Sequence, residues 1–231
     1  KKEKDLIFND IKSFMDSKTE YNSLGIPWKR NYLLEGPPGT GKTSLIFSLA
    51  SEFNLEIFII NLGPKVDDSV FMSAVSNLPN NAILLLEDVD ALFVDRKAND
   101  SNKSLVSFSG ILNVLDGMAR KEGLITFLTT NYKNRLDRAL IRPGRVDFCM
   151  QFDKATNEQI EMMYLKFLPD QTDKLSEFLG KISNYEITMS CLQQFLLECR
   201  FGKKSPLKFK RLRQIIEQIE SKDETPMGLY N

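Results

Sequence analysis

The segment Gly36–Thr43 constrains the fold of this 231-residue chain more than any other part of its sequence. It fits the pattern G-x-x-x-x-G-K-[S/T], and it lies between a short apolar run, Tyr32–Leu34, and a stretch with helical apolar spacing that begins at Leu45. Glycines let the backbone wrap closely around phosphate oxygens, and a following helix directs its positive N-terminal end at them. The pattern therefore predicts a strand, a phosphate-binding loop and a helix in direct succession.

Four further apolar runs predict the rest of a parallel sheet: Glu56–Leu62, Ala82–Leu86, Leu124–Leu128 and Phe148–Phe152. Helical periodicity separates or precedes them, in Asp5–Ser17, in a stretch that Asp67 or Asp68 could cap, and in Val106–Ala119. Continuous apolar strands that alternate with helices are typical of a sheet covered on both faces. After Asp153 only helical periodicity remains, in Thr156–Phe167, Lys174–Ile182, Thr188–Arg200 and Phe209–Glu220.

These patterns predict an α/β domain over residues 1–153 and a small all-α domain over residues 154–231. The helical spacing of Met162 and Met163 places both in the core of the second domain.

Composition excludes several classes of function. The chain has no histidine, which excludes His-based zinc sites and Ser-His-Asp triads. Its 31 basic and 31 acidic residues balance, so no global charge draws it to nucleic acid or to an anionic membrane. The basic run from Arg200 to Arg213 is either a functional patch or a solvated helical face. Three cysteines without C-x-x-C spacing indicate reduced thiols in a reducing compartment.

No apolar run approaches the ~18 residues of a membrane helix. The chain begins at Lys1 rather than Met, and a targeting or membrane segment upstream is left open.

The phosphate loop predicts a site for ATP and Mg²⁺. Lys42 supplies a positive charge to the β- and γ-phosphates, and the Thr43 hydroxyl ligates the metal. The residues expected to bind the nucleotide are Gly36, Pro37, Pro38, Gly39, Thr40, Gly41, Lys42, Thr43 and Ser44.

The run Leu84–Asp88 has the form of a Walker B element, an apolar strand followed by two acids. One carboxylate should hold the Mg²⁺ shell, and the next should orient the attacking water. Most ATPases of this kind have Asp-Glu here, whereas this chain has Glu-Asp. By register Glu87 takes the metal role, partly through water, and Asp88 takes the water role. Because Asp is one methylene shorter than Glu, a slowly hydrolysing nucleotide switch stays open as an alternative. Asp90 is expected to cap a helix.

A polar strand end and two arginines complete the predicted site. Asn131 ends the fourth strand, and it is followed by the spaced residues Asp137, Ala139, Arg142, Arg145 and Asp147. This pattern resembles the second region of homology of AAA ATPases. The resemblance implies that Asn131 senses the γ-phosphate, that Arg142 is an arginine finger acting on the next subunit, and that Arg145 is its companion. An internal pair between Arg145 and Asp147 is the alternative. A finger acting in trans implies a homo-oligomeric ring, a hexamer or heptamer.

A narrower resemblance comes from five blocks together: Gly25–Leu34, the inverted acid pair in Leu85–Ala91, Phe108–Gly117, Thr129–Asn131 and Ala139–Asp147. They are similar to the AAA domain of the mitochondrial inner-membrane chaperones that assemble respiratory complex III by translocating the folded Rieske protein. The resemblance implies strand order 5-1-4-3-2, a helical lid and an ATP-hydrolysing motor that remodels a protein substrate. It also implies the mitochondrial inner membrane for the full-length protein, with membrane contact only through a segment absent here; otherwise the protein is expected to be cytoplasmic.

Two features bear on the substrate and on the adenine. The segment Leu62–Asp68 contains no aromatic residue, which predicts a ring that does not thread polypeptide with aromatic pore loops. The alternative is a nucleic-acid-directed AAA ATPase resembling a clamp loader, which the neutral net charge disfavours. Trp28 either lies near the adenine, as the resemblance implies, or belongs to the core.

Overall fold

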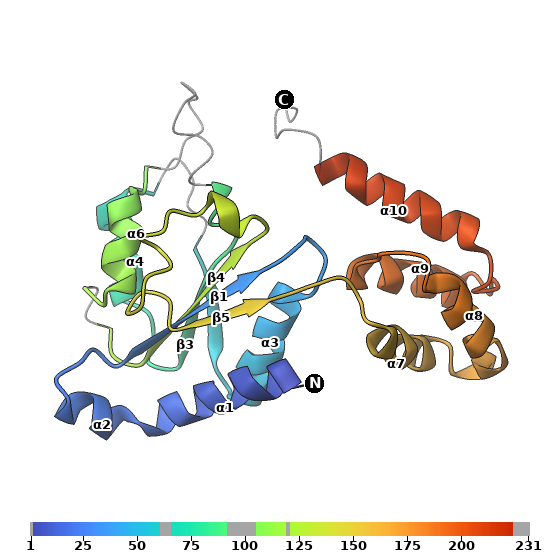
Figure 1. Ribbon diagram of the computed structural model, residues 1–231. Coiled ribbons are helices and arrows are strands. Elements are labelled where there is room, and N and C mark those ends of the chain that lie inside the picture. The colour runs from blue at the N-terminus through green and yellow to red at the C-terminus, as the bar shows by residue number, and fades with distance from the viewer. Residues whose placement is uncertain (1, 61–65, 92–104, 119–120, 224–231) are drawn as a thin grey trace. The chain divides into compact units, whose positions relative to one another are not determined.

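The computed structural model describes residues 2–60, 66–91, 105–118 and 121–223. The segment Leu62–Asp68, where a pore loop would lie, therefore falls partly outside the described residues. The chain divides into two compact units: residues 1–36 with 42–152, and residues 37–41 with 153–231 (Figure 1). Within the described ranges, no helix has both the length and the apolar composition that crossing a membrane requires.

The first unit contains a five-stranded parallel sheet. Its strands are β1 (Lys29–Glu35), β2 (Glu56–Ile59), β3 (Ala82–Leu86), β4 (Leu124–Thr130) and β5 (Phe148–Gln151). Their spatial order is β2-β3-β4-β1-β5, and every pair is parallel. This is the order 5-1-4-3-2 counted from the other edge, so the predicted fold class is confirmed.

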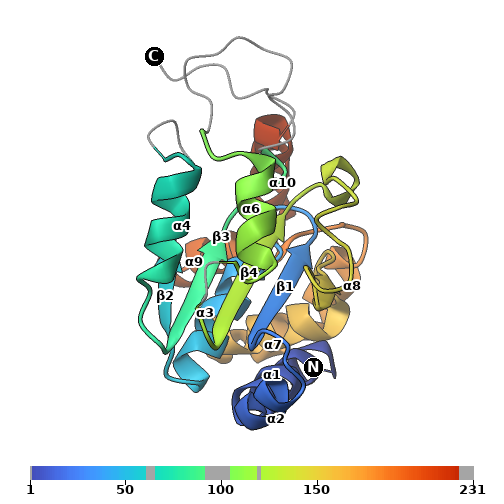
Figure 2. The same ribbon diagram turned by 90° about the vertical axis from the view of Figure 1, so that its left-hand side faces the viewer.

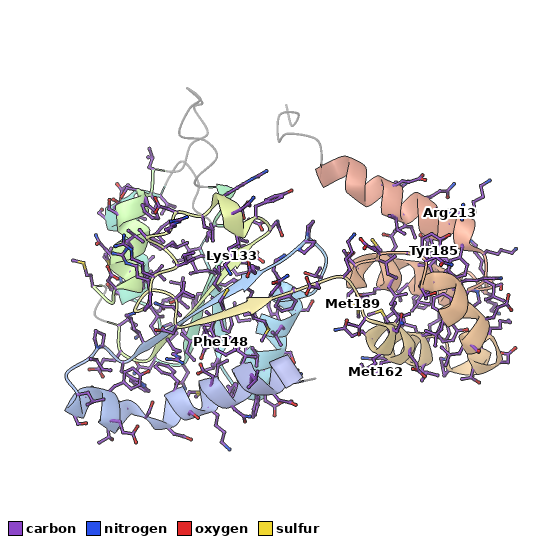
Figure 3. The ribbon with its side chains drawn as sticks, viewed as in Figure 1. Lys133, Phe148, Met162, Tyr185, Met189 and Arg213 are labelled. Carbon is purple, nitrogen blue, oxygen red and sulfur yellow. The ribbon has the colours of Figure 1, made fainter. Side chains whose placement is uncertain are left out.

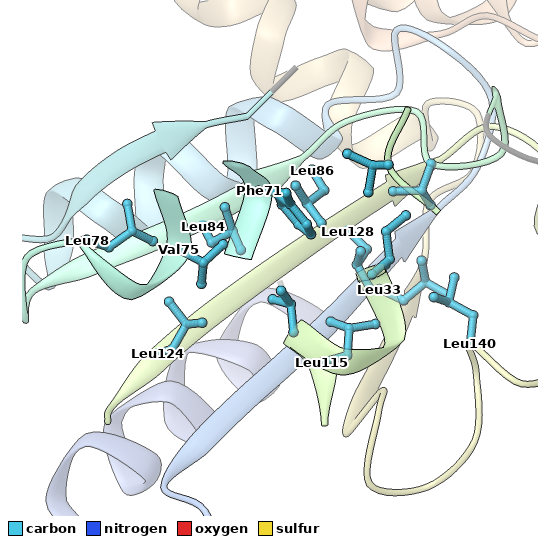
Figure 4. Packing of buried hydrophobic residues seen from close by; sticks show 14 of the residues in the cluster. Leu33, Phe71, Val75, Leu78, Leu84, Leu86, Leu115, Leu124, Leu128 and Leu140 are labelled. Carbon is cyan, nitrogen blue, oxygen red and sulfur yellow. The ribbon is translucent and has the colours of Figure 1, made fainter. Parts of the chain in front are cut away.

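Helices cover both faces of the sheet. Helices α1 (Lys2–Asp16) and α3 (Lys42–Glu52) pack on one face, and α4 (Asp68–Ser76) and α6 (Phe108–Leu115) pack on the other (Figure 2). Side chains alternate along each strand, so Tyr32 and Leu34 face α1 and α3 while Leu33 faces the opposite core (Figure 4). Strands β3 and β4 are buried along their whole length, and β3 is a continuous apolar run, which is why it could be found in the sequence.

Two local features differ from the expectation. A short helix, α2 (Lys18–Ser23), occupies part of the expected loop; it buries none of its residues, so no apolar periodicity marks it. Trp28 precedes β1, whereas the phosphate loop follows its other end. The Trp28 indole N–H donates to the Phe14 carbonyl at 3.0 Å, and the ring packs in the core beside α1. Of the two alternatives for Trp28, the structure supports a place in the core and not one near the adenine.

The second unit is a helical bundle made of α7 (Asn157–Phe167), the 3₁₀ segment η3 (Pro169–Lys174), α8 (Leu175–Ile182), α9 (Met189–Phe201) and α10 (Phe209–Asp223). The side chain and backbone of Thr156 form a capping box with Gln159 at the start of α7. The prediction for Met162 (labelled in Figure 3) was wrong, because this side chain is 64% exposed. Met163 packs against the core. Within this unit the Ser190 N–H also donates to the Gly39 carbonyl at 3.0 Å.

Part of the basic run stabilises this bundle. Arg211 makes a two-point ion pair with Glu198, with both N–O distances 2.7 Å. The Arg213 Nε donates to the Tyr185 hydroxyl at 2.7 Å (both are labelled in Figure 3). Arg200 donates to the Phe167 carbonyl at the end of α7. The other four basic residues of the run are exposed: Lys203, Lys204, Lys208 and Lys210.

Candidate nucleotide-hydrolysis site

The site lies at the carboxyl edge of the sheet, where β1, β3 and β4 end side by side. Glu35 at the end of β1 pairs with Thr130 of β4, and Leu86 at the end of β3 pairs with Leu128. Parallel strands bring the residues that follow them to one edge, so Lys42, the acid pair and Asn131 meet there although they are far apart in sequence.

Gly36 begins the phosphate loop in a conformation that only glycine suits. Its φ is +141°, and a Cβ placed on it would lie 2.1 Å from the Phe152 carbonyl oxygen. The Gly36 N–H extends the sheet by donating to the Thr130 carbonyl at 3.2 Å. The first glycine of the motif is therefore required because the loop passes backbone against backbone as it leaves β1.

Lys42, Asn131 and Asp88 form one hydrogen-bonded chain. The Lys42 ammonium, on a residue that is only 7% exposed, donates to the Asn131 Oδ1 at 2.8 Å and to the Gly36 carbonyl at 2.6 Å. The Asn131 Nδ2 in turn donates to the Asp88 Oδ1 at 3.1 Å. Desolvation lowers the pKa of Lys42, and the nearby Asp88 and Asp90 oppose that shift. A buried ammonium bonded to neutral carbonyl oxygens is well placed to exchange them for the charged oxygens of a phosphate.

Thr43 and Glu87 form a second, separate contact at the same edge. The Thr43 hydroxyl donates to the Glu87 Oε1 at 2.8 Å. Mg²⁺ binds oxygen ligands, and in nucleotide sites it takes one or two from the protein and the rest from phosphates and water. The described residues hold no cluster of three or more His, Cys, Asp or Glu side chains, so a metal caged by protein alone is not indicated there. A hydroxyl and a carboxylate beside a phosphate loop fit a nucleotide-bound Mg²⁺.

Asp88 has an unusual backbone and an unusual carboxyl group. Its φ is +49°, in the left-handed region that few residues other than glycine adopt. Its backbone N–H donates to the Thr129 hydroxyl at 3.1 Å, which helps to hold this conformation. Partial desolvation, together with the charges of Asp90 and Glu87, raises the pKa of the Asp88 carboxyl. A raised pKa suits a group that must accept a proton near neutral pH.

Asp90 also belongs to the site, although its sequence position indicated only a helix cap. It is 6% exposed, and its Oδ1 accepts hydrogen bonds from the Thr130 hydroxyl at 2.6 Å and from the Asn131 N–H at 3.2 Å. Asp90 therefore fixes the backbone from which the Asn131 amide projects. The next residue, Ala91, is already helical, which agrees with a helix that starts after Asp90; the rest of that helix lies outside the described residues. The sequence signal that could have pointed to this role is a third acid, two positions after Asp88, directly behind the end of β3.

The two arginines differ in their surroundings. Arg142 is exposed, and its side chain makes no hydrogen bond or ion pair within the described part of the chain. Arg145 is held internally, but by Asp116 and not by Asp147, which was the partner considered from the sequence. The Asp147 carboxylate accepts from the Asn31 N–H instead. Spacing alone could not reveal Asp116, since it lies 29 positions upstream of Arg145.

A five-stranded sheet in this order, with a lysine, an acid pair and a polar strand end meeting at its carboxyl edge, defines a P-loop nucleotide-binding protein. The chain matches the model of the ATPase family associated with various cellular activities (AAA) over residues 32–154, more than half of its length. It belongs to the AAA ATPase family. Residues 157–206 match a second model, the ATPase lid domain of the mitochondrial chaperone BCS1-like type. The predicted family resemblance is confirmed.

Named relatives agree with these matches. The chain is 38% identical over 223 residues to the probable mitochondrial chaperone BCS1-B of Dictyostelium discoideum, an alignment that covers 84% of this chain and 49% of the relative. It is 41% identical over 180 residues to human mitochondrial chaperone BCS1, with 75% and 43% covered. It is 33% identical over 189 residues to AAA-ATPase At3g50940 of Arabidopsis thaliana, with 76% and 42% covered. The chain thus spans about half the length of these relatives, or less.

Proposed function

We propose that this chain is the ATP-hydrolysing motor of a chaperone that works as a homo-oligomeric ring on a protein substrate. The observation that carries the proposal is the hydrogen-bonded chain from Lys42 through Asn131 to Asp88, beside the separate contact of Thr43 with Glu87. These two contacts divide the site into a part for the γ-phosphate and attacking water and a part for the metal.

The residues take the following roles. Lys42 binds the β- and γ-phosphates, and Thr43 and Glu87 hold Mg²⁺, which supplies charge neutralisation on the triphosphate when bound. Asn131 orients the attacking water, and Asp88 accepts a proton from it. Asp90 keeps the Asn131 backbone in place through its bond to the Asn131 N–H. Arg142 of one subunit neutralises the γ-phosphate bound by the next subunit.

The relatives support the wider setting of this proposal. Human BCS1 and the Dictyostelium protein are named as mitochondrial chaperones, and the helical unit of this chain matches a lid of the same type. We therefore propose a mitochondrial site of action, at the inner membrane, for the full-length protein. The absence of an aromatic residue in Leu62–Asp68 supports work on a substrate that is not threaded as an extended chain.

The first test compares Lys42→Ala with Asp88→Asn. Loss of the Lys42 ammonium should weaken ATP binding by at least ~100-fold, because a charged contact to phosphate is worth about 3 kcal/mol. Asp88→Asn should leave ATP affinity within about 3-fold and lower turnover by about 10²–10⁴-fold, the range for a general base. Binding is measured with a fluorescent ATP analogue, and turnover is measured by phosphate release.

Lys12→Ala serves as the matched control, because Lys12 is an exposed lysine on α1. It should change neither quantity. Equal ATP affinity in Lys42→Ala and the unchanged protein would contradict the site. Tight ATP binding with negligible phosphate release by the assembled ring would favour the nucleotide switch, and a salt-sensitive increase of turnover on adding DNA would favour the nucleic-acid-directed motor.

A further inference from the structure

We propose that Arg145 and Asp116 form a clamp that fixes the turn carrying Arg142, so that Arg145 is a positioning residue and does not itself bind phosphate. This inference rests on the proposed function, because it concerns how the trans-acting Arg142 is aimed.

Every nitrogen of the Arg145 guanidinium already has an acceptor. The Nε and Nη2 atoms donate to the two Asp116 carboxylate oxygens at 2.8 and 2.9 Å, and Nη1 donates to the Ala139 carbonyl at 2.9 Å. The ion pair lowers the pKa of the Asp116 carboxyl, mainly through its hydrogen bonds with Arg145. An arginine that turned away to a phosphate would leave this fork-to-carboxylate pair and the carbonyl without their donors.

The turn between the two arginines is closed by its own backbone. The Arg142 carbonyl accepts from the Arg145 N–H at 3.0 Å and from the Val146 N–H at 3.2 Å. Gly144 has φ of +88°, which a Pro-Gly turn requires at its second central position. The Lys29 ammonium also donates to the Gly144 carbonyl at 2.7 Å. The backbone of the turn that carries Arg142 is therefore held by hydrogen bonds at the Arg142 carbonyl and at the Gly144 carbonyl.

A buried asparagine connects this turn to the sheet and to α6. Asn31 is 1% exposed, and its Nδ2 donates to the Arg145 carbonyl at 2.8 Å and to the Leu115 carbonyl at 3.1 Å. Its backbone exchanges hydrogen bonds with Asp147, at 2.8 and 2.9 Å. Three sequence blocks that are far apart, around Asn31, Asp116 and Arg142, thus converge on one network.

Unlike Arg145, Asn31 and Asp116, the Arg142 side chain has no hydrogen-bond partner in this network. It is exposed, and among the described residues it has no hydrogen-bond or ion-pair partner. A long guanidinium side chain delivers its charge reliably only if its Cα is fixed, because a displacement of ~1 Å at a catalytic group can cost about 10²-fold in rate. The clamp supplies that fixed point, and Arg142 supplies the charge for a second copy of this chain.

A double-mutant cycle tests the clamp in the assembled full-length protein. Asp116→Asn and Arg145→Gln should each lower kcat by about 10–100-fold, while KM and ATP affinity stay within about 2-fold, because the nucleotide pocket of each subunit is intact. The double variant should be no more than about 2-fold slower than the slower single variant, because both changes open the same clamp. Arg138→Gln removes an exposed arginine from the same loop and should leave kcat unchanged.

Two results would overturn the proposal. If Arg145→Gln is as severe as Arg142→Ala while Asp116→Asn is within 2-fold of the unchanged protein, Arg145 contacts phosphate itself. If Asp116→Asn loses ATP affinity in proportion to kcat, its effect is general damage to the fold and not misplacement of Arg142.

Amide hydrogen exchange reads the clamp without any turnover. Asp116→Asn should speed exchange over residues 142–147 by at least about 10-fold, because the Arg145 and Val146 N–H groups close the turn, and it should leave the amides of Tyr32–Leu34 in β1 unchanged. Unchanged exchange over residues 142–147 would refute the clamp. Absence of ATP hydrolysis in the unchanged protein would instead refute the proposed function. The exchange measurement would still show whether the Arg145–Asp116 pair holds the turn, because it does not depend on turnover.

Discussion

Asp88 combines three properties that bear on catalysis: a left-handed backbone, a hydrogen bond from Asn131 and a carboxyl group with a raised pKa. The shift has a definite sign. Since the folded pKa lies above the unfolded one, the stability that Asp88 contributes is fully present below the unfolded pKa and is lost as pH rises through the folded pKa. The ionised form of Asp88 therefore destabilises the fold relative to its protonated form.

Two pH measurements follow from this sign. Turnover of the unchanged protein should fall as pH drops through the raised pKa, so that the acid limb of kcat lies above the ordinary aspartate range near 3.9. Asp88→Asn should unfold at a higher temperature than the unchanged protein at pH 7, and this difference should shrink toward pH 4. Asparagine keeps the left-handed backbone, so strain does not obscure the comparison. An acid limb at the ordinary aspartate value would count against Asp88 as the base.

Strand ends and motif spacing predicted that Lys42, Glu87 and Asn131 belong to one site, and their roles there stay predictions. Geometry now places Lys42 and Asn131 in direct contact and Glu87 beside Thr43. The partners of Asp90 and Arg145 could not be found in this way, because a hydrogen bond across 40 or 29 positions depends on how the chain is folded. No local pattern encodes such a contact.

Helices α4 and α6 are joined by one carboxylate. Asp68, in the first turn of α4, accepts from both the backbone N–H and the hydroxyl of Ser107, at 2.6 Å each, where Ser107 is the N-cap of α6. Gly110 leaves room for this carboxylate, since a Cβ there would lie 2.2 Å from the Asp68 Oδ1 and would displace it. The Ser-x-x-Gly spacing in this block thus serves the packing of two helix starts.

Asp68→Ala should destabilise the protein by about 1–3 kcal/mol, because it leaves the Ser107 N–H without its acceptor. For a chain of this size, that change corresponds to a loss of roughly 2–12 °C in Tm. Differential scanning calorimetry measures the shift, and Glu161→Ala, at an exposed position on α7, is the control and should unfold as the unchanged protein does. A Tm within 1 °C of the unchanged protein would show that the contact is dispensable.

Elements were predictable in proportion to the apolar surface that they bury. The covered strands and the helices of both units emerged from periodicity, and the Asp67 cap of α4 was among the two candidates proposed. The start of β1 was missed because Lys29, Arg30 and Asn31 are polar. They are in the sheet because they find partners elsewhere, as Arg30 does with Asp10 at 2.6 Å. Polar strand ends of this kind depend on tertiary contacts and leave no periodic signal.

For the molecule as a whole, an exposed Arg142 predicts that hydrolysis depends on assembly. Arg142→Ala should bind ATP normally and turn over at least ~10³-fold more slowly, the scale of an arginine finger supplied in trans. Mixing Arg142→Ala with Lys42→Ala subunits should restore part of the turnover that neither has alone, because a Lys42→Ala subunit still offers its Arg142 to an intact neighbouring site. Phosphate release after co-assembly provides the measurement.

The matched control is a mixture of Lys42→Ala with Asp88→Asn. Each of these subunits has a defect within its own site, so no neighbour can repair it and no turnover should return. Equal rates in the two mixtures would mean that Arg142 does not act across a subunit boundary.

The main-chain conformation after β3 also bears on the order of the two acids, Glu87 and Asp88. At φ near +49° a short acid or amide is tolerated, whereas a longer glutamate gains no local hydrogen bond to offset a strain of about 1–2 kcal/mol. Exchanging Glu87 and Asp88 to reach the commoner order would therefore require the following turn to be reshaped as well. The order of these two acids is therefore tied to the main-chain conformation after β3 as well as to their charge.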